Sequence, residues 1–125
     1  MNFSITTIKL KKVDSTNLYA KALFNDLPDG SLILADSQTA GRGRLGREWI
    51  SPPGVNVYAS LVMKHVSNPF YATIVASLSV LDTLRKASPK NKFYIKWPND
   101  IYAGAGKISG ILCECVISAD NKVAG

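Results

Sequence analysis

The segment Gly-Arg-Gly-Arg-Leu-Gly-Arg at residues 41–47 limits the local structure of this chain more than any other feature. Three glycines in seven residues disfavour both helix and strand, so we expect a loop that orders on binding. Glycine lets the backbone approach a ligand closely, and guanidinium groups form paired hydrogen bonds with phosphates and carboxylates. The segment therefore predicts an anion-binding loop. An exposed arginine-glycine segment that binds RNA loosely is the alternative.

Strand-like and helix-like segments surround this loop. Apolar runs and period-two alternation predict strands at residues 4–13, 31–35, 55–63, 92–97, 101–103 and 107–117, the last two as a hairpin. Capping residues at 14–17 predict a helix that follows them and stops within the turn-forming residues 25–30. Asn68 and Pro69 predict the start of another helix, which runs to about Ala87. This order predicts an α+β fold with a mixed β-sheet and flanking helices, in a single domain over residues 1–125.

Composition narrows the class of protein. With 46% hydrophobic and 19% charged residues, the chain is expected to be soluble and globular. The longest apolar-leaning stretch contains polar side chains, so no membrane span is expected, and the start lacks the pattern of a secretory signal. Cys113 and Cys115 are expected to be reduced, packed thiols, so we predict a cytoplasmic protein. The net charge of +6 favours an anionic partner.

Three further motifs carry polar side chains. Residues 96–100, Lys-Trp-Pro-Asn-Asp, place a cation, an indole, an amide and a carboxylate at a predicted strand end, which could hold a purine nucleotide or simply end the strand. Lys107 begins an apolar strand that we expect to be central, which would aim its amine at the same ligand; otherwise it is a solvated charge. Residues 14–17, Asp-Ser-Thr-Asn, are an ordinary helix cap that could also bind a neutral polar ligand.

Taken in order, the four motifs resemble the catalytic domain of biotin–protein ligases. The matching residues are 14–17 (Asp-Ser-Thr-Asn), 38–44 (Gln-Thr-Ala-Gly-Arg-Gly-Arg), 96–100 and 106–107, within a resemblance that runs from about Lys12 to Val116. It implies the class II aminoacyl-tRNA synthetase-like, or biotin–lipoate ligase, fold. It also implies ATP-dependent activation of biotin to biotinyl-5′-AMP, followed by transfer to a lysine of a biotin carboxyl carrier protein.

The resemblance further implies roles for individual residues. The biotin-binding residues would be Ser15, Thr16, Asn17, Gln38, Arg42, Gly43, Arg44, Lys107 and Gly110. The nucleotide-binding residues would be Arg44, Arg47, Trp49, Lys96, Asn99 and Asp100, with Asp100 also a ligand of the Mg²⁺ that accompanies ATP. Lys107 and Arg42 would be catalytic, because attack of a carboxylate on a phosphate brings negative charges together.

Two departures from the family pattern shape the expectations. Leu45 stands where several members have a basic residue, and the chain ends at Gly125, where members continue. We therefore expect a C-terminally truncated, poorly active ligase without a DNA-binding domain or a specific DNA partner. A strand at 107–117 that is apolar on both sides would also pair with another copy, which predicts a homo-oligomer.

Three alternatives remain open at this point. A lipoate–protein ligase or transferase has a similar fold, although the Gly-Arg loop and residues 96–100 favour biotin. A truncated domain could retain biotin or nucleotide without turnover. A basic nucleic-acid binder would need exposed aromatic side chains on strands, for which only Tyr94 and Tyr102 are suitable.

Overall fold

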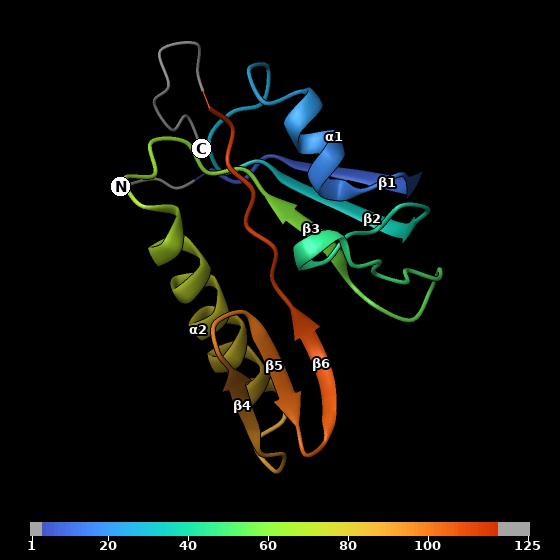
Figure 1. Ribbon diagram of the computed structural model, residues 1–125. Coiled ribbons are helices and arrows are strands. Elements are labelled where there is room, and N and C mark those ends of the chain that lie inside the picture. Colours follow the sequence, from blue (N-terminus) through green and yellow to red (C-terminus); the bar gives the residue numbers. More distant parts are fainter. Residues whose placement is uncertain (1–3, 118–125) are drawn as a thin grey trace. The chain divides into compact units, whose positions relative to one another are not determined.

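The computed structural model describes residues 4–117, which form two compact units (Figure 1). The first unit comprises residues 4–67 together with 114–117, and the second comprises Asn68–Cys113. Each unit has its own sheet, its own helix and its own hydrophobic core. That the two units make one domain stays a prediction.

The first unit contains a mixed three-stranded sheet in the order β1-β2-β3. Strand β1 (Thr7–Val13) runs parallel to β2 (Leu32–Gln38), and β3 (Tyr58–Leu61) runs antiparallel to β2. The parallel pair is connected through helix α1 (Thr16–Ala22), as the sequence predicts. The predicted α+β class and mixed sheet are confirmed, and β2 extends three residues beyond the predicted end at Ala35.

Helix α1 packs on one face of this sheet (Figure 1). Ser15 is its N-cap, with a side-chain oxygen that accepts a hydrogen bond from the backbone N–H of Leu18 at 3.4 Å. Ala20 from the helix is buried with Phe24, Ile33 and Val62 in the core of the unit. This packing fixes the start of α1 beside the ends of β1 and β2, where the predicted ligand-binding residues lie.

Strand β3 buries the side that its polar residues occupy. Tyr58 and Ser60 are buried, whereas Leu61 is 51% exposed and Val57, just before the strand, is 85% exposed. The period-two alternation therefore predicts the strand correctly, although β3 is shorter than the predicted 55–63. Polar partners explain the burial: the Tyr58 hydroxyl donates to the Pro52 carbonyl at 2.8 Å, and Ser60 joins the network described below.

The second unit packs helix α2 (Pro69–Ala87) against an antiparallel sheet of β4 (Phe93–Lys96), β5 (Asp100–Ala103) and β6 (Gly106–Gly110) (Figure 1). The core contains Leu81, Phe93 and Ile101. The bounds of α2 agree with those predicted, and the Asn68 side chain accepts from the backbone N–H of Phe70 at 3.0 Å as the N-cap. Neither helix in the described part of the chain has the length and apolar composition needed to cross a membrane.

The predicted strand at 107–117 is wrong beyond Gly110. Asn99 bonds both backbone groups of Ile111: its carbonyl accepts from the Ile111 N–H at 2.9 Å, and its side-chain amide donates to the Ile111 carbonyl at 3.0 Å. The partner strand β5 begins only at Asp100, so the ladder has no further partner there and residues 111–116 are irregular. Self-association stays a prediction, now without the apolar strand on which it was based.

The two cysteines lie in this irregular segment. Cys113 and Cys115 are both free thiols, as predicted, but both are exposed rather than packed. The prediction assumed that a strand would turn the thiols toward a core, and the segment is not a strand.

Candidate functional site

A hydrogen-bonded group forms where α1 begins beside the end of β2. The side-chain oxygen of Gln38 accepts from the backbone N–H of Thr16 at 2.8 Å and from the Thr16 hydroxyl at 3.2 Å. The side-chain amide of Gln38 donates to Ser51 Oγ at 2.9 Å. Thr16 and Ser15 are buried. Three of the predicted biotin-binding residues, Ser15, Thr16 and Gln38, are thus brought together across 22 positions of sequence.

Ser60 connects this group to Asn17. From its buried position on β3, the Ser60 hydroxyl forms hydrogen bonds with Thr16 Oγ1 at 2.7 Å and with Asn17 Oδ1. Asn17 in turn donates through Nδ2 to Glu114 Oε2 at 3.1 Å. The network therefore passes from the helix cap to a carboxylate that lies 97 positions away in the sequence.

The Gly-Arg loop, residues 41–47, begins at Gly41, which packs closely against this hydrogen-bonded group. A Cβ atom at Gly41 would meet the carbonyl oxygen of Trp49 far inside contact distance, Ser51 Oγ at 2.7 Å and Gln38 Nε2 at 3.0 Å. The Gly41 carbonyl also accepts from the backbone N–H of Trp49 at 2.8 Å. Gly41 is therefore required by close backbone approach, whereas Gly43 would have only ordinary contacts with Arg47, at 3.5 and 3.6 Å.

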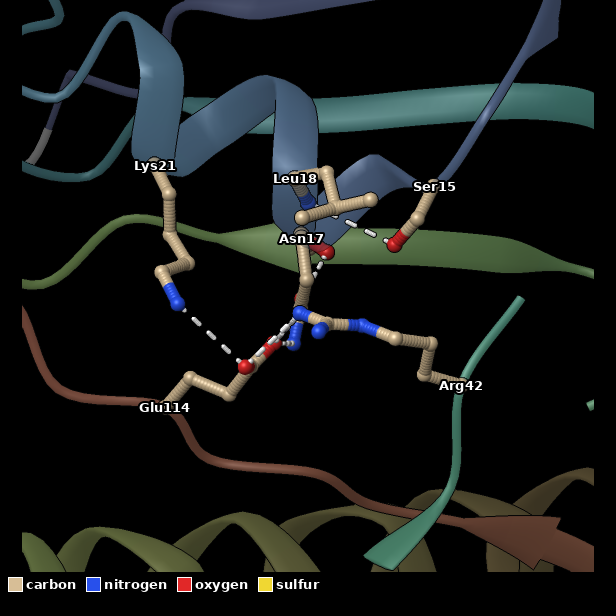
Figure 2. A network of polar contacts seen from close by, with 7 residues as sticks. Ser15, Asn17, Leu18, Lys21, Arg42 and Glu114 are labelled. Carbon is tan, nitrogen blue, oxygen red and sulfur yellow. Dashed lines mark hydrogen bonds and ion pairs between the residues drawn. The ribbon is translucent and has the colours of Figure 1, made fainter. Parts of the chain in front are cut away.

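Arg42 follows directly and forms an ion pair with Glu114 (Figure 2). Its Nη2 atom lies 2.8 Å from Oε1 and 3.0 Å from Oε2 of the carboxylate. Lys21, on the last turn of α1, reaches the same carboxylate at 3.4 Å, and Figure 2 shows Asn17, Lys21 and Arg42 converging on it. Two cations thus surround one carboxylate at the edge of the hydrogen-bonded group.

The surroundings of Glu114 favour its ionised form. Burial by itself raises the pKa of this carboxyl, but the hydrogen bond from Asn17 and the charges of Lys21 and Arg42 outweigh it and leave the pKa below the ordinary value of 4.5. Glu114 is therefore an anion at neutral pH.

Acid is expected to remove the stability that Glu114 contributes. A folded-state pKa below the unfolded one means that the contribution is complete above the unfolded value of 4.5 and is lost as the pH falls through the lower folded value. Glu114→Gln should therefore be less stable than the wild type near pH 7, with a difference that shrinks as the pH falls well below 4.5. Urea midpoints measured across this range test it, with Glu48→Gln on the exposed loop as the control. A wild-type advantage that persists in acid would contradict the prediction.

The tip of the loop carries the remaining arginines. A short 3₁₀ turn (Arg44–Gly46) closes it, with Leu45 at φ 58° and Gly46 at φ 72°. Leu45 is 89% exposed, so an apolar side chain in the left-handed region makes no core contact that would explain its presence. Arg44 and Arg47 are also exposed.

Trp49 lies at the other end of the loop, beside an open depression of about 840 Å³. Gln38, Ser51, Lys11 and Lys12 also line this depression. The sequence predicts that Trp49 contacts a nucleotide, and the structure places it beside Gln38 and Ser51 in the first unit.

The other predicted residues lie in the second unit. Lys107 on β6 forms an ion pair with Asp100 on β5 at 2.8 Å, so the predicted catalytic lysine contacts the predicted Mg²⁺ ligand. Gly110 pairs with Asp100 in the sheet, and the Lys96 ammonium lies 5.5 Å from the centre of the Tyr102 ring. Asn99 is buried and holds Ile111, which gives it a structural role that the sequence analysis did not predict.

The sequence analysis missed four members of the network: Lys21, Ser51, Ser60 and Glu114. Glu114 carries a readable signal, because it is the one charged residue in the otherwise apolar or small run 108–118. Ser60 and Ser51 carry none, because their roles depend on which face of β3 is buried and on how the loop returns to Gln38.

Comparison with known proteins gives consistent matches. The profile described as biotin/lipoate A/B protein ligase family matches residues 9–124 of the chain. The bifunctional ligase/repressor BirA of Escherichia coli is 39% identical over 108 residues, which is 84% of this chain and 33% of that protein. The biotin–[acetyl-CoA-carboxylase] ligase of Paracoccus denitrificans is 41% identical over 109 residues, which is 84% of this chain and 45% of that protein.

Solved structures agree with these sequence matches. The biotin protein ligase from Aquifex aeolicus in complex with biotin and ATP superposes with a TM-score of 0.80 at 37% identity, over 94% of this chain and 49% of that one. The chain spans between a third and a half of the length of these relatives. The profile covers nearly all of the chain, which confirms the resemblance seen in the sequence. The chain belongs to the biotin/lipoate A/B protein ligase family.

Proposed function

We propose that this chain forms the biotin- and ATP-binding part of a biotin–protein ligase. Such an enzyme activates biotin to biotinyl-5′-AMP and transfers it to a lysine of a biotin carboxyl carrier protein. The observation that carries the proposal is the hydrogen-bonded network of the first unit, which joins Thr16, Gln38 and Arg42 through Asn17 and Glu114. The match to a biotin protein ligase in complex with biotin and ATP supports the same ligands.

The first unit has the polar groups that biotin requires. A ureido ring has a carbonyl that accepts hydrogen bonds and two N–H groups that donate them. The hydroxyls of Ser15 and Thr16 and the side-chain amide of Gln38 offer both donors and acceptors within one partly buried group. Arg42 adds a guanidinium for an anionic group of the ligand, either the biotin carboxylate or the phosphate of the adenylate.

The reaction consists of two displacements. An oxygen of the biotin carboxylate attacks the α-phosphorus of ATP, the bond to the β-phosphate oxygen breaks, and pyrophosphate leaves. The lysine amine of the acceptor then attacks the acyl carbon, loses a proton, and expels AMP. Negative charge concentrates in the first step, so the cationic side chains of Arg42 and Lys107 would stabilise its transition state electrostatically. Closure of the Gly-Arg loop would protect the mixed anhydride from water.

The Mg²⁺ ion that accompanies ATP would need few ligands from the protein. In nucleotide sites this ion takes one or two carboxylates and completes its shell with phosphate oxygens and water. The described residues contain no group of three or more Asp, Glu, His or Cys side chains that could hold a metal. Asp100 fits the role of a single carboxylate ligand, and its partner Lys107 would then be released toward the negative phosphates.

A cytoplasmic location belongs to the same proposal. Two free, exposed cysteines are ordinary in a reducing compartment, where thiols stay unpaired.

Biotin is expected to raise the melting temperature of the chain, and lipoate to raise it much less. Biotin at about 100 times its Kd would stabilise the folded state by about 2.7 kcal/mol, a shift of several degrees. Gln38→Ala should lose most of the shift. Ser79→Ala should keep it, because Ser79 is exposed on α2 and bonds only the Val75 carbonyl of its own helix. A larger shift with lipoate would assign the chain to lipoate chemistry instead.

Pyrophosphate release separates an active ligase from a domain that only binds. With biotin and ATP present, turnover predicts pyrophosphate in proportion to biotinyl-AMP formed. A chain that gains stability from biotin without releasing pyrophosphate would be a binding module, which is the second candidate.

A further inference from the structure

Glu114 holds the Arg42 guanidinium by a single nitrogen. Both oxygens of the carboxylate contact Nη2, at 2.8 and 3.0 Å. Within residues 4–117, the structure gives Nε and Nη1 of Arg42 no protein partner, so these two nitrogens keep their hydrogen-bonding capacity. This geometry differs from a paired fork, in which the carboxylate would occupy two guanidinium nitrogens. The ion pair orients the side chain and leaves one of its edges for another acceptor.

The carboxylate is itself held by two side chains of α1. Asn17 donates to Oε2 at 3.1 Å, and Lys21 lies 3.4 Å from Oε1, both from α1. Asn17 cannot turn away easily, because its own Oδ1 is bonded to the buried hydroxyl of Ser60. The Glu114 side chain is 20% exposed, against 39% for Arg42. Glu114 is thus the more buried of the two, and Asn17, Lys21 and Arg42 all contact it.

The charges of this cluster do not cancel. Lys21 and Arg42 are both cationic, Glu114 supplies one negative charge, and Asn17 is neutral. One positive charge therefore remains, which attracts a further anion rather than repelling it. A carboxylate that competed with the ligand for Arg42 would instead cancel the charge of the cluster and bond two nitrogens of the guanidinium.

We infer that Glu114 is a positioning residue: it orients Arg42 so that the free edge of the guanidinium meets the carboxylate or phosphate of the bound ligand. The inference rests on the proposed function, because it takes biotin and biotinyl-AMP as the ligands. It assigns a purpose to a residue outside the four sequence motifs. It also predicts the sign of a mutation, since a positioning carboxylate helps binding whereas a competing carboxylate hinders it.

Titration calorimetry with a non-hydrolysable sulfamoyl analogue of biotinyl-AMP tests the inference. Glu114→Gln keeps the side-chain shape without the charge and should weaken binding of the analogue about tenfold. Glu114→Asp keeps the charge and should recover part of the loss. Asp82→Asn, which removes the carboxylate of the exposed ion pair with Lys86 on α2, is the control and should bind like the wild type.

A double-mutant cycle separates positioning from a general structural effect. Arg42→Ala should weaken binding of the analogue, and Glu114→Gln should add little in that background, because the residue it positions is gone. Equal losses in both backgrounds would overturn the inference, and so would tighter binding by Glu114→Gln, the mark of a competitor. A wild type that binds neither biotin nor the analogue would refute the proposed function, and the inference with it.

Trypsin provides a measurement that needs no ligand. The enzyme cleaves after arginine, so cleavage at Arg42, Arg44 and Arg47, followed by mass spectrometry, reports how firmly the loop is held. Glu114→Gln should be cleaved faster at Arg42 than Asp82→Asn is. Equal rates would show that Glu114 does not hold Arg42 in solution, which would overturn the inference even if ligand binding were normal.

Discussion

Replacing Gly41 with alanine is expected to lower the free energy of unfolding by about 2 to 3 kcal/mol and to remove most biotin binding. The added Cβ would overlap the carbonyl oxygen of Trp49 and lie 2.7 Å from Ser51 Oγ and 3.0 Å from Gln38 Nε2. The first of these is backbone, which a rotamer change cannot relieve. The loop base would have to open, and Gln38 would lose its fixed position beside Thr16.

Gly43→Ala is the matched control for this substitution. It lies two residues away in the same loop, but its Cβ would meet only Arg47, at 3.5 and 3.6 Å, which is ordinary contact. Chemical unfolding of both variants should therefore show a large loss for Gly41→Ala and a change within about 0.5 kcal/mol for Gly43→Ala. Similar losses at the two positions would show that loop entropy, rather than close approach at Gly41, explains the glycines.

Lys107→Ala is expected to slow formation of biotinyl-AMP by about 100-fold or more while leaving the fold intact. The cation would stabilise charge that develops only in the transition state, which affects rate far more than ground-state binding. Its ion pair with Asp100 is partly exposed, with the two side chains 33% and 23% accessible, so its loss should cost at most about 1 kcal/mol. Pyrophosphate release at saturating biotin and ATP, together with the melting temperature, measures both effects.

Lys86→Ala is the control, because it removes a more exposed ion pair of which neither partner is a predicted site residue. Lys86 lies 2.7 Å from Asp82 on the exposed side of α2, one turn away. This variant should keep the wild-type rate. If Lys107→Ala instead melted much lower and kept its rate, Lys107 would be a structural partner of Asp100 rather than a catalytic residue.

Local sequence predicts the elements of this chain well where one signal decides them. Asn68 and Pro69 set the start of α2, because a side-chain cap and a fixed φ favour helix whatever surrounds them. The same holds for the β5–β6 turn at Gly104, where a φ of 58° suits glycine. Beyond Gly110 an apolar run alone predicts a strand, but a strand also needs a partner strand. Both backbone groups of Ile111 are bonded by Asn99 instead.

The sequence predicted which residues belong to the candidate site better than it predicted which of them contact one another. Ser15, Thr16 and Gln38 lie in motifs that the sequence marks, and the structure joins them. Lys107 and Asp100 were assigned to different roles, yet they are ion partners. An ion pair between residues on neighbouring strands depends on the register of the hairpin, which no local pattern specifies.

The sequence by itself determined the type of chemistry available to this protein: a glycine-rich loop with three arginines, a helix cap with hydroxyls, and a lysine at a hairpin. Only the tertiary structure decided that β3 turns Ser60 inward while Leu61 stays exposed, because period-two alternation defines two faces without saying which one a helix covers. It also decided that Glu114 meets Arg42, since a contact across 72 positions exists only after the sheet and α1 have packed. Residue types come from the sequence, whereas the direction in which each side chain points comes from packing.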